Sequence, residues 1–584
     1  MKDIKISVPK GRAYINWFGK KPIDTASFYP AQLVEKTQES DDIKDLEFSK
    51  LEKNWHNLLF HGDNKEVLST LLTTGFRGKI DLIYIDPPFD SGANYVRKIE
   101  LRGIKANIIG QEESIFEQAQ YNDIWKNDSY LQFMYERLIL MRELLSEQGS
   151  IYLHCDWHKS HHLRFLLDEV FGSDNFVNEV IWHYRSGGAS KVSSLARKHD
   201  NILHYRKSDE FYINILKERQ YLDKSFMDSK QDKEGRYYVD TILRDVFSDI
   251  INIVDCDNII HQYNTRPVLN VSAERLAYPT QKPEGLISLL IELATSPDSI
   301  VLDCFMGSGT TQAVAQKLGR RWIGVDCNKG AIQTTIKRLQ KIIHEQKSNL
   351  LENNKNQYKI LHYQVNNYDF RIIQDATEII FKKYGLQKSN DSFFIAKRGE
   401  EFVKIIELHR PLVLLDIQLV IDELFKKDSE ERCILIFNGI QDDAKITEVL
   451  KNYHKTMPSM SKIELWDIQK DEIFEYKEPD CEVEFKGDKN QVRIKIKSYI
   501  SDKIIQRLNV DKTIFDLDIK DFRACIDYVL IDTNYNGEIF STCFSDVPKN
   551  KKDFIRGEYS VESQGIVAVK IVSMLGEESI ILQT

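Results

Sequence analysis

The sequence predicts an α/β fold built on a mostly parallel sheet, and two observations support this. Residues 79–85 form a short, mostly apolar run rich in β-branched and aromatic side chains, which is typical of a buried strand. Residues 299–303 and 321–326 also read as strands, and a helical pattern over 310–318, ended by Gly319, lies between them. Strand, helix and strand in this order indicate a βαβ unit, whose two strands pair in parallel.

Further elements of this sheet precede the βαβ unit. From Leu51 a strand leads to His61, and a helix follows it. This helix has apolar residues at Val67, Leu68, Leu71 and Leu72. A long polar loop is expected over residues 90–127, followed by a second helix that ends at Gly149. The apolar face of the second helix consists of Leu131, Met134, Leu138, Met141 and Leu145.

Composition indicates a globular protein with several cores. The chain has 584 residues, of which 42% are hydrophobic and 29% charged, and two to four domains are expected. Its formal net charge of -9 excludes a surface that is basic throughout, so any contact with nucleic acid must be local. The eight cysteines are scattered without a Cys-x-x-Cys pair, so neither a disulfide framework nor a thiolate zinc site is indicated. Without a long apolar run or a signal-peptide core, we expect a soluble, cytoplasmic protein.

Changes in pattern along the chain suggest six regions. They are an N-terminal extension (1–50), two halves of the α/β domain (51–182 and 278–347) with an insert between them (183–277), an accessory α/β region (348–474) and a β-rich, sandwich-like module (475–584). In the last module Val492, Ile494 and Ile496 alternate, and Asn536-Gly537 predicts a hairpin turn. The module contains no catalytic constellation, so we expect it to bind a partner or a second copy.

One candidate catalytic motif, Asp86, Pro87, Pro88 and Phe89, directly follows the strand of residues 79–85. The Asp86 carboxylate and the Pro87 carbonyl can accept the two hydrogens of an exocyclic amine such as that of adenine, which favours the developing cationic nitrogen. Pro88 stiffens the loop, and Phe89 offers a stacking face for a base that has been flipped out of a duplex. Taken alone, the motif is also compatible with a rigid turn after a strand.

A second motif lies in the turn of the βαβ unit, from Asp303 to Gly309. Gly307 and Gly309 allow the backbone to approach a ligand, and Asp326 at the end of the next strand is placed to bind ribose hydroxyls. A dinucleotide fingerprint requires a third glycine where Gln312 stands, and the Gly-Lys-Ser/Thr of a P-loop is absent. The remaining candidate is a nucleoside without a pyrophosphate, such as S-adenosylmethionine.

Together these motifs resemble those of amino-group DNA methyltransferases of the permuted β group, in which the catalytic motif precedes the cofactor loop. Asp86-Pro87-Pro88-Phe89 has the form usual for N6-adenine enzymes, and the segments 60–63, 278–283 and 151–170 resemble other parts of the group's pattern. The resemblance covers residues 50–345. Chain size and the C-terminal part are similar to those of type III restriction-modification modification subunits and their relatives.

The resemblance implies a Rossmann-like methyltransferase sheet with circularly permuted motif order, and an insert that recognises the target. It also implies S-adenosylmethionine as cofactor, S-adenosylhomocysteine as product and no metal. The implied cofactor-binding residues are Asp63, Lys282, Asp303, Phe305, Gly307, Gly309 and Asp326. The expected substrate is a flipped adenine in double-stranded DNA, and the possible partners are a second copy of the chain and a restriction subunit.

A basic run is the candidate DNA contact. It contains Arg185, Lys191, Arg197, Lys198, Arg206 and Lys207 against one acid, Asp200. A loop of this charge can grip phosphates, although an ordinary solvated loop fits the charge equally well. The nearby His154, Cys155, Asp156, Trp157 and His158 have metal-ligand spacing, but we interpret them as strand-end and helix-start residues near a DNA-facing cleft.

Three other functions are compatible with the sequence. An N4-cytosine methyltransferase would use the same amine chemistry, and so would a methyltransferase acting on RNA or on a small molecule. A catalytically silent DNA-binding or regulatory subunit would keep the fold without turnover. The intact Asp86, Phe89, Gly307 and Gly309 favour an active enzyme.

Overall fold

The computed structural model comprises two compact units. One is formed by Met1–Val365 together with Pro479–Thr584, and the other by Asn366–Glu478. The residues that the structure describes are 4–5, 7, 15–17, 20–38, 40, 46–88, 96–100, 107–112, 126–185, 195–269, 272, 274–276, 280–348, 358–365, 380–389, 391, 393–406, 412–427, 432–437, 440, 443–456, 462–468, 479–488, 491–501, 504, 521–548 and 553–583. Within these ranges, no helix is both long enough and apolar enough to cross a membrane.

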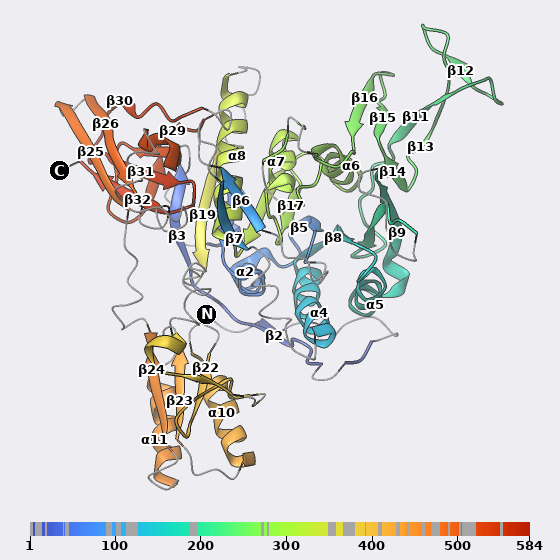
Figure 1. The fold of residues 1–584 in the computed structure, drawn as a ribbon. Coiled ribbons are helices and arrows are strands. Elements are labelled where there is room, and N and C mark those ends of the chain that lie inside the picture. Colours follow the sequence, from blue (N-terminus) through green and yellow to red (C-terminus); the bar gives the residue numbers. More distant parts are fainter. Residues whose placement is uncertain are drawn as a thin grey trace. The chain divides into compact units, whose positions relative to one another are not determined.

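The large unit is built on an 11-stranded sheet with the order β14-β9-β10-β8-β5-β17-β18-β4-β19-β3-β28 (Figure 1). The strands from β8 to β19 in this order are mutually parallel. They are β8 (Leu145–Cys155), β5 (Ile80–Ile85), β17 (Ile300–Asp303), β18 (Arg321–Asp326), β4 (Asn57–His61) and β19 (Ile360–Val365). The predicted α/β fold with a mostly parallel sheet is therefore confirmed.

Antiparallel pairs flank this parallel core on both sides. Next to β8 lie β10 (His199–Arg206) and β9 (Phe176–His183), and β14 (Val246–Ser248) pairs in parallel with β9. On the other side, β3 (Ala31–Thr37) pairs antiparallel with β19, and β28 (Phe540–Thr542) pairs in parallel with β3. Segments from both ends of the chain thus complete the sheet.

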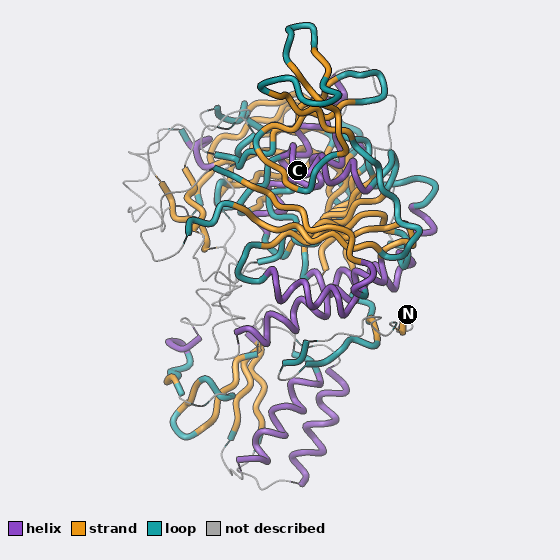
Figure 2. Tube along the Cα trace, turned by 90° about the vertical axis from the view of Figure 1, so that its right-hand side faces the viewer, coloured by secondary structure: helices purple, strands orange, loops and turns teal. Residues whose placement is uncertain are grey.

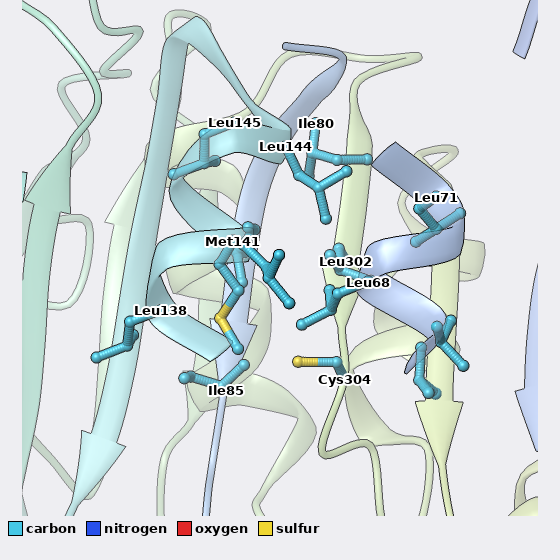
Figure 3. Packing of buried hydrophobic residues seen from close by; sticks show 14 of the residues in the cluster. Leu68, Leu71, Ile80, Ile85, Leu138, Met141, Leu144, Leu145, Leu302 and Cys304 are labelled. Carbon is cyan, nitrogen blue, oxygen red and sulfur yellow. The ribbon is translucent and has the colours of Figure 1, made fainter. Parts of the chain in front are cut away.

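Helices cover both faces of the sheet, as Figures 1 and 2 show. One face carries α2 (Asn64–Leu71), which continues as a π-turn (Leu72–Phe76), α4 (Lys126–Leu144) and α5 (Ser160–Phe171). The other face carries α6 (Glu284–Ala294), α7 (Thr310–Lys317) and α8 (Lys329–Ser348). Strand side chains alternate between the two cores, since Ile83 packs in the first and Leu82 in the second. Figure 3 shows the first core, where Met141 of α4 lies near Ile85.

The insert forms a second, antiparallel sheet. Its order is β12 (Lys230–Gln231), β13 (Tyr237–Ile242), β11 (Lys217–Leu222), β15 (Ile250–Val254) and β16 (Ile260–Asn264). The hairpin that ends in β12 extends away from the main sheet (Figure 1). β9, β10 and β14, by contrast, extend the main sheet, so part of the insert is continuous with it.

The C-terminal module, residues 479–584, contains two antiparallel sheets around one core. The first consists of β25 (Asp480–Asp488), β26 (Gln491–Ile500) and β30 (Glu558–Glu562). The second consists of β29 (Phe544–Asp546), β27 (Ile526–Asp532), β31 (Ala568–Ser573) and β32 (Glu578–Leu582). Val492, Val529 and Val569 belong to one buried cluster, so both sheets face the same core. This module belongs to the same compact unit as the 11-stranded sheet.

The remaining elements are short or belong to the small unit. The small unit contains β20 (Gln387–Lys388), β21 (Ala396–Arg398), β22 (Glu401–Ile405), α10 (Leu414–Lys427), β23 (Cys433–Phe437), α11 (Asp443–Thr456) and β24 (Ile463–Asp467). The large unit also has β1 (Ile4–Lys5), β2 (Thr25–Ala26), α1 (Phe48–Leu51), a 3₁₀ turn at Ser173–Asn175 and another at Phe522–Cys525.

Two local predictions were wrong. The helix α4 ends at Leu144 rather than Gly149, because the following residues form the long strand β8 beside β5. The expected loop of residues 90–127 contains a paired β6 (Val96–Glu100) and β7 (Asn107–Glu112). Around the predicted Asn536-Gly537 turn, β27 and β29 do pair antiparallel, and β28 between them pairs with β3 in the main sheet.

Candidate active site

Four carboxylates gather at the carboxyl edge of the parallel strands. Asp86 follows β5, Asp303 and Asp326 end β17 and β18, and Asp63 comes two residues after β4. These four strands are consecutive neighbours, so the four residues lie in a row along one edge. This edge is where the sequence predicted the site.

The strand order makes the gap between β5 and β17 a topological switch point. From β5 the chain passes through α4 to β8 on one side, whereas from β17 it passes through α7 to β18 on the other. The helices α4 and α7 pack in different cores, on opposite faces of the sheet. Open α/β sheets bind their ligands in the crevice that such a reversal leaves beyond the strand ends.

Asp86 connects the two halves of the predicted site. One carboxylate oxygen forms an ion pair with Lys282 Nζ, and both side chains are largely buried. The other oxygen, Oδ1, is buried and has no hydrogen-bond partner among the residues that the structure describes. The Lys282 carbonyl in turn lies 3.5 Å from the Thr310 hydroxyl at the start of α7. The site therefore presents an unsatisfied carboxylate oxygen beside the predicted cofactor turn.

Asp303 is buried directly next to Asp86. Its carboxylate accepts hydrogen bonds from the Thr311 hydroxyl at 2.6 Å and from the Phe305 amide at 3.0 Å. Burial raises the pKa of the Asp303 carboxyl to about 7, and the charge of Asp86 contributes to the increase. That electrostatic coupling places the two carboxylates in one environment. Because Asp303 uses both oxygens within its own turn, its role there is to shape the turn.

The glycine turn has the backbone conformation that glycine alone adopts easily. Gly307 has a φ of 50° and Gly309 a φ of 68°. A Cβ atom on Gly309 would lie 2.5 Å from the hydroxyl oxygen of Thr335 in α8. The turn is thus held closely against α8, and a larger residue at Gly309 would displace one or the other.

Asp326 joins the glycine turn to the start of α8. Its carboxylate accepts the Gly307 amide at 2.9 Å and the Asn328 amide at 2.8 Å. Burial raises the pKa of the Asp326 carboxyl to about 6. Asn328 caps α8 by accepting the Gly330 amide at 2.7 Å. One hydrogen-bonded unit therefore contains the turn, Asp326 and the first turn of the helix.

Asp63 is fixed by an arginine that the sequence analysis missed. Asp63 caps α2 by accepting the Lys65 amide at 2.8 Å, and Arg137 of α4 donates to its two oxygens at 2.9 and 3.1 Å. Arg137 also donates to the Asn64 side chain, whose amide reaches the Cys304 carbonyl at 2.9 Å. The sequence did contain one signal of this ion pair, an arginine among the apolar positions of α4. A buried arginine requires polar partners.

The aromatic residue of the cofactor motif also lies at this edge. The Phe305 ring is 6.1 Å from that of Phe133, and the Arg137 guanidinium lies 3.5 Å from the centre of the Phe133 ring. Phe305 is only partly buried, so part of its ring remains accessible to a ligand.

A buried hydrogen-bonded chain borders Asp86 on the side of β8. The Tyr84 hydroxyl and His154 Nδ1 are 3.0 Å apart, and His154 Nε2 lies 3.3 Å from an oxygen of Asp200. The Tyr184 hydroxyl donates to the other Asp200 oxygen at 3.0 Å. The hydrogen bond from His154 holds the pKa of the Asp200 carboxyl below its usual value, against the effect of burial. None of these contacts was foreseen from the sequence.

The predicted basic run does not form one surface. Arg197 lies at the carboxyl edge with its guanidinium 3.5 Å from the ring centre of Trp157, and Arg185 pairs with Asp249. Lys198 precedes β10 on that side. Arg206 and Lys207 lie at the other end of β10, which runs antiparallel to β8, and hence at the edge opposite Asp86.

Some predicted residues lie outside the described part of the chain. They are Phe89, Lys191, Tyr278 and Pro279. Pro87 and Pro88 follow Asp86 directly in the described segment. Across the described residues, no group of three or more potential metal ligands was found, and His158 of the histidine cluster pairs with Asp156 at 2.5 Å.

Comparison with known proteins agrees with this geometry. Residues 80–338 match the family model N6_N4_Mtase, described as DNA methylase. Residues 80–338 are thus similar to a DNA methylase domain. The match begins at β5, directly before Asp86, and ends within α8, so it includes the predicted catalytic motif, the insert and the predicted cofactor turn.

Curated relatives include type II methyltransferases, type III restriction-modification Mod subunits and the DNA adenine methyltransferase YhdJ of Escherichia coli. The chain is 27% identical over 332 residues to the type II methyltransferase M.EcaI of Enterobacter cloacae, covering 48% of this chain and 69% of that protein. It is 25% identical over 341 residues to the type III restriction-modification enzyme StyLTI Mod subunit of Salmonella typhimurium, covering 46% of this chain and about half (51%) of that protein. Among solved structures, the M1.HpyAVI-SAM complex matches with 18% identity and a TM-score of 0.29, covering 48% of this chain and 98% of that one.

Proposed function

We propose that the protein is an S-adenosylmethionine-dependent DNA methyltransferase that modifies the N6 amine of an adenine flipped out of double-stranded DNA. The observation that carries this proposal is the buried, unsatisfied Oδ1 of Asp86 at the switch point between β5 and β17. A hydrogen-bond donor from a substrate would satisfy this oxygen. The similarity to a DNA methylase domain and the named adenine methyltransferase among the chain's relatives support the choice of substrate.

The catalytic role of Asp86 follows from the chemistry of the amine. The lone pair of the adenine amine is delocalised into the ring, so the nitrogen becomes nucleophilic only as it approaches tetrahedral geometry. Asp86 and the Pro87 carbonyl would each accept one hydrogen of the amine and hold it in that geometry. As the nitrogen bonds to the methyl carbon it becomes cationic, and the carboxylate stabilises that charge until one proton is lost.

The residues at the carboxyl edge fit a nucleoside cofactor. Asp326 would bind the ribose and Asp63 the adenine, while the glycine turn at Gly307 and Gly309 gives the backbone close access to the ligand. Partly exposed Phe305 offers an apolar ring beside them. S-adenosylmethionine supplies a sulfonium methyl group when it is bound.

Lys282 is suited to the carboxylate end of that cofactor. Its ammonium is paired with Asp86, and its backbone contacts Thr310 of the glycine turn's helix. A cation beside Asp86 opposes the developing charge on the amine, so transfer is favoured when Lys282 turns to another anion. The cofactor's methionine carboxylate is such an anion, which would couple cofactor binding to release of Asp86 for its substrate.

The wider setting is proposed from the relatives. We propose that the protein belongs to a restriction-modification or phage-defence system, since relatives are named as type III Mod subunits. The partners we propose are a restriction subunit and a second copy of the chain. The protein would act in the cytoplasm, on the DNA of the cell that produces it. The insert with its extended hairpin would read the target sequence.

Mass spectrometry of digested DNA tests the proposal. DNA incubated with the protein and S-adenosylmethionine should contain N6-methyladenine, whereas N4-methylcytosine would refute the base assignment. Calorimetric binding of S-adenosylhomocysteine without product on any DNA would favour the silent regulatory subunit instead. Competition between duplex DNA and RNA of the same sequence would separate a DNA enzyme from an RNA enzyme.

A further inference from the structure

The C-terminal module contacts α8 directly at the end of the helix that adjoins the cofactor turn. Lys329, the first residue of α8, forms an ion pair with Glu578 at 3.0 Å. One turn later, the Gln333 amide donates to the Gly576 carbonyl at 2.7 Å. Gly576 fits closely there, because a Cβ atom would lie 2.2 Å from the Gln333 side chain. The turn between β31 and β32 therefore packs closely against the first turns of α8.

The first turn of α8 carries a lysine that a carboxylate of the C-terminal module pairs with. The first turn of α8 contains no acidic residue and begins with a lysine. A helix N-terminus carries a partial positive charge, so a cation at this position is unfavourable unless a negative charge lies nearby. Glu578 provides that charge from the module. Burial would raise the pKa of the Glu578 carboxyl, but Lys570 and Lys329 together hold it well below its usual value. Glu578 therefore stays ionised at neutral pH.

A buried charge pair fixes the position of Glu578. Lys570 lies 2.9 Å from Glu578 and 2.9 Å from Glu35 of β3, and both Lys570 and Glu35 are almost wholly buried. Such groups tolerate few alternative positions, because moving one partner leaves the other as an uncompensated buried charge. The module is thereby held in one register against the main sheet.

On its other side, α8 holds the glycine turn. The Thr335 hydroxyl lies 3.4 Å from the Gly307 carbonyl, and Arg338 donates to the Ser308 carbonyl at 3.2 Å. At its start, α8 is joined to Asp326 through Asn328. A shift of the first turn of α8 would therefore move both the ribose-binding carboxylate and the turn.

We propose that the C-terminal module is a positioning element for the cofactor site, and that Glu578 acts through Lys329 to hold Asp326 and the glycine turn in their binding geometry. The inference rests on the proposed function and assigns the module to cofactor affinity in addition to any partner. Because coupling between two sites is reciprocal, cofactor binding should also tighten the contact of the β31–β32 turn with α8.

Calorimetry with S-adenosylhomocysteine on the full-length chain tests the inference, with Glu578→Gln as the variant. Asp527→Asn is the matched control, because Asp527 is also a module carboxylate paired with a lysine of α8, but that lysine, Lys337, lies two turns after Lys329 and away from Asn328 and Asp326. Glu578→Gln should weaken binding about fivefold, the equivalent of ~1 kcal/mol. Asp527→Asn should change affinity by less than about twofold, even if it lowers stability as much.

Equal affinities of Glu578→Gln and wild type, or equal weakening in both variants, would overturn the inference. If the wild type itself fails to bind, the proposed cofactor site is refuted instead, so the two failures are distinguishable. Hydrogen exchange on the wild-type chain gives a measurement that does not depend on a variant folding. S-adenosylhomocysteine should slow exchange in Ser573–Glu577 but leave β25 and β26 unchanged, and the absence of protection in that turn would equally overturn the inference.

Discussion

Replacing Asp86 by asparagine should separate the chemical role of this residue from its role in stability. The substitution keeps the shape of the side chain but removes the charge that stabilises a cationic amine. Loss of one preorganised group of this kind typically lowers kcat by about 10²- to 10³-fold. Since the interaction belongs to the transition state, affinity for S-adenosylhomocysteine should not fall more than about threefold, and any increase would reflect a Lys282 that no longer pairs with Asp86.

Stability should fall as well, because Asp86 is the ion-pair partner of Lys282. Breaking a fully buried pair costs about 3–5 kcal/mol and an exposed pair about 0–1 kcal/mol. The side chains of Lys282 and Asp86 are 8% and 19% exposed, so we expect a loss of about 2 kcal/mol, between these limits. The double variant Asp86→Asn/Lys282→Met removes the cation too and should recover most of this loss without recovering transfer.

Single-turnover transfer of a labelled methyl group to duplex DNA, with urea unfolding of the same preparations, measures both effects. Asp81→Asn is the control on the same strand, because Asp81 lies at the opposite end of β5 and bonds Ser146 and the Ile300 amide. Its transfer rate should stay within about twofold of wild type. Retention of more than about a tenth of the wild-type rate by Asp86→Asn, or recovery of transfer in the double variant, would refute the reasoning.

Three further substitutions test the edge of the site. Gly309→Ala should lower the unfolding free energy by about 2 kcal/mol and weaken S-adenosylhomocysteine binding more than about tenfold, because a Cβ atom meets Thr335 at 2.5 Å and φ is positive; unchanged calorimetric affinity would contradict this. Asp303 has a folded-state pKa of about 7 against about 4 when unfolded, so it takes up a proton on folding, and its contribution makes stability fall as pH rises from 4 to 7. Asp303→Asn should therefore flatten the dependence of the unfolding free energy on pH over that range, as measured by urea unfolding. If the variant and the wild type show the same pH dependence, Asp303 is not its cause. Arg137→Met should destabilise by about 3 kcal/mol and weaken cofactor binding, as it leaves the Asp63 carboxylate without its guanidinium partner; a binding isotherm like that of wild type would show that Asp63 needs no such support.

The elements that carry the site could be predicted because their signals are local. Apolar runs, glycines and strand-end polar residues, all within about 30 residues, predict the strand before Asp86 and the βαβ unit around Gly307. The predicted α7 and β18 match the structure closely, with β18 at Arg321–Asp326 as expected. The pairing of β5 with β17 was not predicted, because pairing partners leave no local mark in the sequence.

The contacts that the sequence did not reveal join residues far apart in the chain. Lys282 and Asp86 are 196 residues apart, and Thr542 and Glu35, which bond across β28 and β3, are 507 apart. The Asn536-Gly537 turn predicted the antiparallel pair of β27 and β29, but nothing near it indicates that β28 pairs with β3 in the main sheet. Charged residues on buried surfaces are the one local hint of such contacts, because each requires a partner.

The strand order explains why neither half of the proposed methyltransferase region would make the site alone. β17 and β18 stand between β5 and β4, so the proposed cofactor strands are inserted within the other half of the sheet. Asp86 has its carboxylate neighbour Asp303 only because β17 pairs with β5, and Asp63 is reached only across β18. The C-terminal module contacts this region through α8 and β3. The proposed site consequently depends on contacts among four separate stretches of chain, and a change in the C-terminal module should affect Asp326 and the glycine turn, through α8, before it affects Asp86.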